Sequence, residues 1–125
     1  MAARNFSNTT YSLQRDVVNL FLKGVGAGAA DLTGVLTSTG IKSVHETGTG
    51  AYDITLTDKY NSLLMASFNV IDAGTIDDWE VVLATDLTNS NVISIQVFKG
   101  GTATDLTTSQ TLIGKISLSN TQRPV

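Results

Sequence analysis

Apolar and polar side chains alternate over several short stretches of the chain. Every second residue is apolar from 52 to 56, and again from 93 to 97. A period of two places successive side chains on opposite faces of a β-strand, so these stretches predict strands with one buried face. The side chains predicted to face the core are Tyr52, Ile54, Leu56, Ile93, Ile95, Val97, Leu112, Ile116 and Leu118. Together with the turn residues between the runs, the pattern predicts strands at 41–46, 52–57, 63–71, 79–85, 92–98 and 111–119.

The stretch 11–23 fits two structures. Leu13, Val17 and Leu20 share one face of a helix, but the apolar run 17–22 fits a buried strand equally well. The valines and phenylalanine of this run, and the glycine that follows it, favour the strand.

Three other stretches lack a clear period. Residues 24–40 are rich in Gly, Ala, Ser and Thr and are interpreted as a long connection that leaves room for one short strand around Val35. Residues 1–10 are predicted to be a flexible N-terminal arm, because they offer little to bury. Residues 121–125 are interpreted as a C-terminal tail. One domain over 11–120 remains, close to the commonest domain size.

These strands and turns predict an all-β fold. We expect an antiparallel, jelly-roll-like β-sandwich of six to eight short strands, because no stretch carries a long helical pattern. Charged residues make up only 15% of the chain, and threonine, which suits a pleated strand, is frequent. Such a sandwich has edge strands, and the chain has little lysine or proline to protect them. We therefore expect another subunit to cover these edges.

Charge and composition argue against several classes of function. The net charge of −3 gives no basic field for nucleic acid. No stretch approaches the about 20 apolar residues that a membrane span needs, so no membrane partner is predicted. The first residues lack the apolar core of a signal peptide, so export by that route is not expected. The chain has no cysteine, which excludes disulfides and thiolate metal sites.

The acidic loop 72–78 is the best candidate for a metal site. Asp72, Asp77 and Asp78 carry carboxylates, the oxygen ligands that calcium prefers. Their spacing does not match a calcium-binding helix–loop–helix, and Asp and Gly are also the residues that turns use. A solvated turn is the favoured interpretation, and we predict no bound metal and no cofactor.

The sequence does not favour an enzyme. His45 is the only histidine, and no Gly-x-Ser-x-Gly nucleophile motif is present. His45 is expected to face solvent or a subunit contact. Trp79 begins an apolar strand and is expected to lie in the core or in an interface rather than to serve as a platform for a sugar.

The stretch from Gly50 to Tyr60 follows the pattern Gly-x-Tyr-x-Ile-x-Leu-x-x-Lys-Tyr, and a strand ending near Gly100-Gly101 and a last apolar strand at 111–119 come after it. In this pattern of strands and turns, from about 11 to 120, the chain resembles small structural proteins of tailed bacteriophages, above all head decoration (cement) proteins. Residues 1–10 have no counterpart in the resemblance, and the family offers no catalytic residues.

The resemblance implies a protein of the virion, made in the host cytoplasm, that binds the outer capsid surface and stabilises the head. Its expected partners are the major capsid protein and its own copies, in a homotrimer. The alternative is a receptor- or carbohydrate-binding module of a phage tail fibre or spike, and a hydrolase using acidic residues is a third reading. The side chains expected to contact capsid or a neighbouring subunit are Arg4, Asn5, Phe6, Tyr11, His45 and Trp79.

Overall fold

The protein is built from β-strands. The computed structural model describes residues 17–35, 40–60, 62–85 and 91–119, and within these residues it contains no helix. The eight strands are β1 (Val17–Val25), β2 (Ile41–Gly48), β3 (Ala51–Leu56), β4 (Ser62–Asp72), β5 (Trp79–Leu83), β6 (Val92–Lys99), β7 (Thr102–Ala103) and β8 (Gln110–Ser119). All pairings between them are antiparallel. In the described residues no helix is long and apolar enough to cross a membrane.

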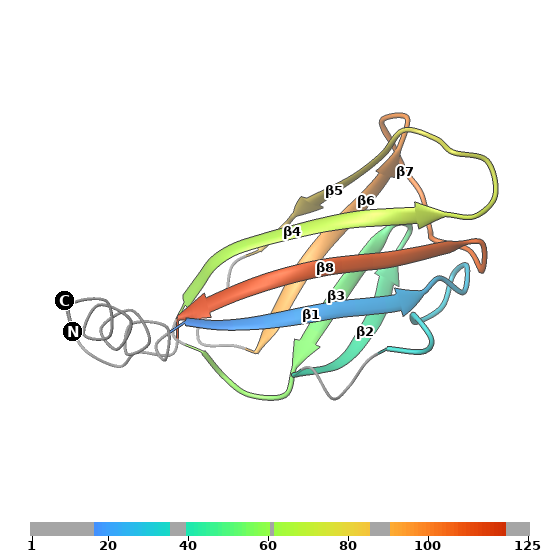
Figure 1. The fold of residues 1–125 in the computed structure, drawn as a ribbon. Coiled ribbons are helices and arrows are strands. Elements are labelled where there is room, and N and C mark those ends of the chain that lie inside the picture. Colours follow the sequence, from blue (N-terminus) through green and yellow to red (C-terminus); the bar gives the residue numbers. More distant parts are fainter. Residues whose placement is uncertain (1–16, 36–39, 61, 86–90, 120–125) are drawn as a thin grey trace, which may run out of the picture.

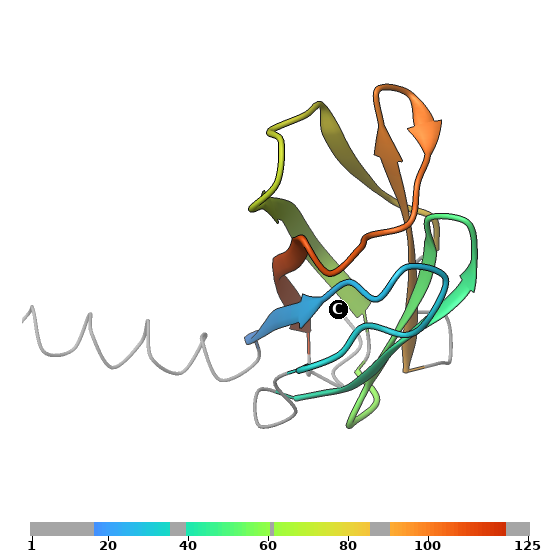
Figure 2. The same ribbon diagram turned by 90° about the vertical axis from the view of Figure 1, so that its right-hand side faces the viewer.

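The strands form two sheets that face each other. Sheet A has the order β1-β8-β4, and sheet B has the order β2-β3-β6-β5, with the short β7 paired to β6. Figure 1 shows the sheets as two layers, and Figure 2 shows the same layers after a turn of 90°. The predicted antiparallel β-sandwich is therefore confirmed.

The core lies between the sheets and is built from the alternating positions. Every side chain predicted to face inward from 52 to 56, from 93 to 97 and from 112 to 118 is at most 1% exposed. Burying one such side chain stabilises the fold by about 1.5 to 3 kcal/mol. The alternation found in the sequence is thus the main source of stability.

The ambiguous stretch before residue 24 contains a strand, as favoured, because β1 begins at Val17. The short strand for which the sequence left room around Val35 is not present in the described residues up to Val35. An isolated bridge forms two residues earlier, where Val25 and Thr33 exchange backbone hydrogen bonds of 2.8 and 2.9 Å. Val35 instead packs against the core. The hairpin of β6 and β7 was not predicted, because β7 is only two residues long.

Segment 26–35 covers the side of the sandwich between β1 and β2. The backbone N–H of Leu32 donates to the carbonyl of Val44 on β2 at 3.2 Å. The Leu32 side chain is only 6% exposed and belongs to the core cluster. This segment runs from β1 to the other sheet in Figure 2 and so closes the core on this side.

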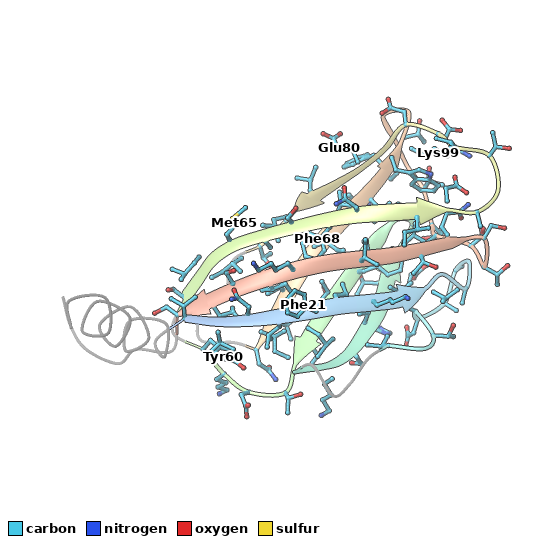
Figure 3. The ribbon with its side chains drawn as sticks, in the orientation of Figure 1. Phe21, Tyr60, Met65, Phe68, Glu80 and Lys99 are labelled. Atoms are coloured by element: carbon cyan, nitrogen blue, oxygen red, sulfur yellow. The ribbon has the colours of Figure 1, made fainter. Side chains whose placement is uncertain are left out.

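A glycine in β8 makes room for an aromatic ring that packs against the core. Gly114 pairs with Phe68 of β4, and a Cβ atom at position 114 would lie 2.4 Å from Cδ1 of that ring. The Phe68 ring therefore occupies the space that a side chain at 114 would need. Figure 3 labels Phe68 on β4.

The hydroxyl of Tyr52 satisfies a buried backbone N–H group in the core. Tyr52 is fully buried, and its hydroxyl accepts a hydrogen bond of 2.9 Å from the backbone N–H of Leu106, which is also fully buried. Burial raises the pKa of Tyr52, so the hydroxyl stays protonated at neutral pH. This bond ties the segment before β8 to the centre of sheet B.

Replacing Tyr52 with Phe should lower the free energy of unfolding by about 1 to 3 kcal/mol, because the buried Leu106 N–H loses its acceptor. Urea unfolding followed by circular dichroism measures the change. The matched control is Tyr60→Phe, since the Tyr60 side chain is only half-buried. Equal effects of the two substitutions would contradict the assigned role of the Tyr52 hydroxyl.

Candidate interaction surfaces

The outer face of sheet A carries large apolar side chains. Strand β8 lies between β1 and β4, so outward side chains of the three strands stand in rows across the sheet. Phe21 is 54% exposed, Met65 65% and Ile71 50%, and each occupies such an outward position. Figure 3 shows Phe21 on β1 and Met65 on β4. The outward rows are Asn19–Ser117–Met65, Phe21–Lys115–Ser67, Lys23–Ile113–Asn69 and Val25–Thr111–Ile71.

The charges on this face have one sign. In the rows just given, Lys23 and Lys115 are the charged residues, and no carboxylate accompanies them. The outer face of sheet B differs, because it carries the carboxylates of Asp53 and Glu80. The net charge of the chain is negative, so the sheet A face is a local positive region on an acidic protein. Such a face attracts a partner surface that carries carboxylates.

A shallow hollow lies in the middle of this face. Its volume is about 480 Å³, and apolar, lysine and uncharged polar side chains line it. The hollow gives the otherwise flat sheet a place where an apolar side chain of a partner can insert. Its lining residues are Phe21, Leu22, Lys23, Ser67, Asn69, Ile113, Gly114 and Lys115.

The sheet A face is small for an interface. Three strands about 4.8 Å apart, each about nine residues long, cover about 15 Å by 30 Å, or about 450 Å². Stable interfaces bury about 800 Å² on each partner. A single copy that binds through this face alone would bind weakly, so stable attachment needs several copies acting together.

The side of the sandwich between β4 and β5 forms a second candidate surface. The inward side chains of these two strands are half-buried or, at Leu83, exposed, in contrast to the fully buried ones of β3, β6 and β8. Two hollows of about 340 and 380 Å³ lie along this side, and we call them together the β4–β5 groove. One end of the groove is lined by Phe68, Asn69, Val70, Asp72, Ile76, Asp77, Trp79 and Val81, and the other by Leu63, Leu64, Met65, Leu83, Ala84 and Thr85.

Both strands beside the groove are edge strands. Within the described residues, β4 pairs only with β8, and β5 pairs only with β6. The side of each strand that faces the groove therefore presents backbone N–H and C=O groups that no neighbouring strand in the described chain pairs. A sheet edge of this kind can accept an added strand.

Asp72 organises the acidic end of the groove. Its Oδ1 atom accepts hydrogen bonds from Gln110 Nε2 and from the backbone N–H of Gly74, each at 3.0 Å, and its Oδ2 atom accepts one from Trp79 Nε1 at 2.9 Å. These donors, Gln110 first, hold the pKa of Asp72 below its usual range. The network joins the end of β4 to the starts of β5 and β8.

Replacing Asp72 with Asn should lower stability near neutral pH and make stability less sensitive to acid. The pKa of Asp72 is lowered in the folded protein by its hydrogen bonds, from Gln110 first, so its ionised carboxylate stabilises the fold at neutral pH. This stabilisation is lost as the pH falls through the folded-state pKa. Thermal melts at about pH 7 and about pH 2 measure the effect, and the difference in Tm between the two proteins should shrink at acid pH. A Tm difference that is equal at both pH values would contradict stabilisation by the ionised Asp72 carboxylate. Asp78→Asn is the control for the loss of one negative charge.

The loop 72–78 does not assemble a recognisable cation site. Asp77 lies 3.4 Å from the Lys99 ammonium and also accepts a hydrogen bond from the backbone N–H of Asp78 at 2.8 Å. The Asp78 bond lowers the pKa of Asp77 most, and Lys99 lowers it further. In the part of the chain that the structure describes, no three His, Cys, Asp or Glu side chains are grouped closely enough to hold a metal ion.

Trp79 lies between the core and the groove. Its side chain is half-buried and packs against the core cluster, and its indole N–H donates a hydrogen bond to Asp72. The Lys99 ammonium lies 5.6 Å from the centre of the ring, within the range of a cation–π interaction. Figure 3 shows Lys99 near the loop that follows β4.

His45 lies on the outer face of sheet B, far from the groove in the strand order. Its Nδ1 atom is 2.7 Å from Oδ1 of Asp31, which also accepts a hydrogen bond from the backbone N–H of Glu46. The bond from Glu46, together with His45, lowers the pKa of Asp31. Both side chains of the pair are about 60% exposed, so the pair fastens segment 26–35 to β2 only weakly.

The sequence pointed to only part of these surfaces. Arg4, Asn5, Phe6 and Tyr11, predicted as contacts, lie outside the described residues. The outward apolar residues of sheet A and the half-covered core beside β4 and β5 were missed. The sequence signal for the exposed apolar residues of sheet A is an apolar residue where the alternation predicts a polar one, as at residue 21. Comparison with protein-family models, curated proteins and solved structures finds no match to this chain.

Proposed function

We propose that this protein is a structural protein of a tailed-bacteriophage virion, a decoration protein that binds the outer capsid surface as a homotrimer and stabilises the head. The observation that carries the proposal is the outer face of sheet A, which combines exposed apolar side chains with two lysines and no carboxylate. This face suits attachment to an acidic protein surface. The resemblance of residues 50–60 to phage structural proteins selects the capsid as that surface.

The size of the face explains why a trimer is part of the proposal. One copy offers about 450 Å², too little for stable attachment on its own. Three copies placed over a threefold junction of the shell present the same contact three times. Once the first copy has bound, the others bind at a high effective concentration, and dissociation then requires three contacts to break together. Binding across the junction joins neighbouring shell subunits and resists their separation.

The test is to mix the purified protein with expanded, undecorated capsids and to image the particles by cryo-electron microscopy. We expect added density over the threefold positions of the shell. Capsids already saturated with the protein serve as the control and should gain no density. Bare threefold positions at saturating protein would refute the proposal, and density only on tail fibres would favour the alternative function.

The alternative, a carbohydrate- or receptor-binding module, has one supporting observation. The hollow of about 340 Å³ at the acidic end of the groove is lined by Trp79, Asn69, Asp72 and Asp77, which are residue types common in sugar sites. However, the Trp79 indole N–H and the Asp72 carboxylate already bond to each other, and Lys99 lies over the ring. The groups that would hold a sugar are thus engaged within the protein, and we favour the capsid.

A further inference from the structure

We propose that the β4–β5 groove receives the N-terminal segment, residues 1–16, of a second copy of this chain, which adds a strand to the sandwich. The inference deepens the proposed function, because it rests on the self-association of that function and names the contact that produces it. Four observations support the inference: the incomplete burial of the core beside the groove, the edges of β4 and β5 left unpaired in the described chain, the apolar alternation of the segment, and the opposite charges of the segment and the groove.

The core is incomplete beside the groove. On the opposite side, segment 26–35 inserts Leu32 between the sheets. The inward residues of the two strands there are at most 5% exposed: Leu20 and Leu22 of β1, and Ile41 and Val44 of β2. No described segment does the same between β4 and β5, where Phe68, Val70 and Val81 remain only half-buried. One added strand with apolar side chains on one face would cover these three residues as Leu32 covers its own side.

The edges of the groove can bind such a strand through its backbone. β4 is 11 residues long, and in the described chain it has a strand partner on one side only. A segment lying along β4 would pair with this edge by main-chain hydrogen bonds, while its alternate side chains enter the groove.

The N-terminal segment has the sequence that the groove requires. Thr9, Tyr11 and Leu13 alternate with the polar residues Asn8, Thr10 and Ser12. In an extended strand the first three share one face, and two of them are large enough to fill the hollows. The segment contains no proline, so every position except the chain start can donate to a neighbouring strand.

The charge and the length of the N-terminal segment also match the groove. Arg4 and Arg15 are the cationic side chains of the segment, and Asp72 and Asp77 line one end of the groove. A strand that places Tyr11 near the apolar middle of β4 brings Arg4 towards this acidic end. Sixteen extended residues span about 50 Å, which exceeds the length of β4.

The flanks of the groove favour a second copy over the segment of the same chain. Leu64 and Met65 are 53% and 65% exposed at the rim, where the chain bulges between Leu63 and Met65. A strand inserted from the same molecule would fill the groove but would leave this rim in water. A second molecule that donates its segment also brings its own body against the rim and covers it.

The first experiment compares two full-length variants that carry the same charge on opposite faces of the segment. Tyr11→Asp/Leu13→Asp places the charges on the face proposed to enter the groove. Thr10→Asp/Ser12→Asp places them on the opposite face of the segment. We expect the first variant to lose the oligomer in native mass spectrometry and the second to keep it. Trp79, the only tryptophan, lines the groove, so its emission should shift to longer wavelength in the first variant alone. Equal oligomers and equal emission in both variants would overturn the proposal.

The second experiment identifies the donor of the strand. Tyr11 is replaced by the photo-crosslinker p-benzoylphenylalanine, and the irradiated protein is analysed on a denaturing gel and by peptide mapping. Crosslinks from position 11 to β4 or β5 in covalent dimers or larger species support the proposal. Crosslinks to these strands within a monomer assign the groove to the same chain's segment and overturn it, as do crosslinks elsewhere. Both experiments use the isolated protein, so the strand contact can fail or hold independently of capsid binding.

Discussion

Leu32→Ala is expected to lower the free energy of unfolding by about 2 to 5 kcal/mol. Leu32 is the side chain that segment 26–35 inserts between the sheets, and it is 6% exposed. Truncation removes its apolar contacts and leaves a cavity that the hydrogen bond from its backbone to Val44 holds open. A domain of this size has about 5 to 15 kcal/mol of total stability, so the loss is a large fraction.

Chemical unfolding in urea, followed by circular dichroism, measures this change, and Leu64→Ala is the matched control. Leu64 is 53% exposed, so its truncation should cost about 1 kcal/mol or less. Both substitutions are made in the Tyr11→Asp/Leu13→Asp background, so that self-association does not cover Leu64. Equal costs for the two leucines would show that segment 26–35 does not close the core.

The sequence predicted the strands with one fully buried face, because burial there depends on local alternation. Tyr52, Ile54 and Leu56 point inward as expected, and β3 ends within one residue of its predicted boundary. The period of two is a property of the strand itself, so it survives whatever the strand packs against.

The stretch that became β1 was ambiguous for a reason that bears on function. Leu20 and Leu22 face the core, but Val17 and Phe21, on the other face, are apolar as well. The run therefore looks continuously apolar and hides its period of two. What obscured the strand in the sequence is the exposed apolar character of sheet A, the feature on which the proposed capsid contact rests.

The groove and the Asp72 network could not be found from the sequence. Asp72 and Gln110 are 38 positions apart and meet only because β4 pairs with β8. In the middle of β4, Ala66, Phe68 and Val70 alternate with Ser67 and Asn69 as inward and outward residues do in β3, so the period there predicts equal burial for both strands. Whether a face is covered depends on the packing of the opposite sheet, and that is not encoded in the local period.

In the proposed assembly, the two surfaces have separate roles. The β4–β5 groove would join copies to each other, and the outer face of sheet A would join the resulting trimer to the shell. Sheet A presents its face on the side away from sheet B, so strand insertion into the groove covers only Met65 at the rim and leaves the rows with Phe21, Lys23 and Lys115 accessible. This separation predicts that capsid binding can be removed without loss of the oligomer.

Reversing both lysines of the sheet A face, in Lys23→Glu/Lys115→Glu, should weaken binding to expanded capsids by about 10³-fold or more. Each reversal costs about 1 kcal/mol when a partner charge lies close in a wet interface, and the cost is repeated in every copy of a trimer. Sedimentation of capsids with labelled protein at increasing salt measures the affinity, and the parent should lose affinity with salt more steeply than the variant.

The matched control for this reversal is Lys42→Glu/Lys59→Glu, which gives the same net charge at exposed lysines outside the sheet A face. If net charge alone governed binding, both variants would weaken equally. If the sheet A face makes the contact, the control should bind within a few-fold of the parent, because its lysines lie on other parts of the surface. Native mass spectrometry of both variants should show the parent's oligomer, since neither alters the groove. Loss of capsid binding in the control alone would place the contact elsewhere and exclude sheet A.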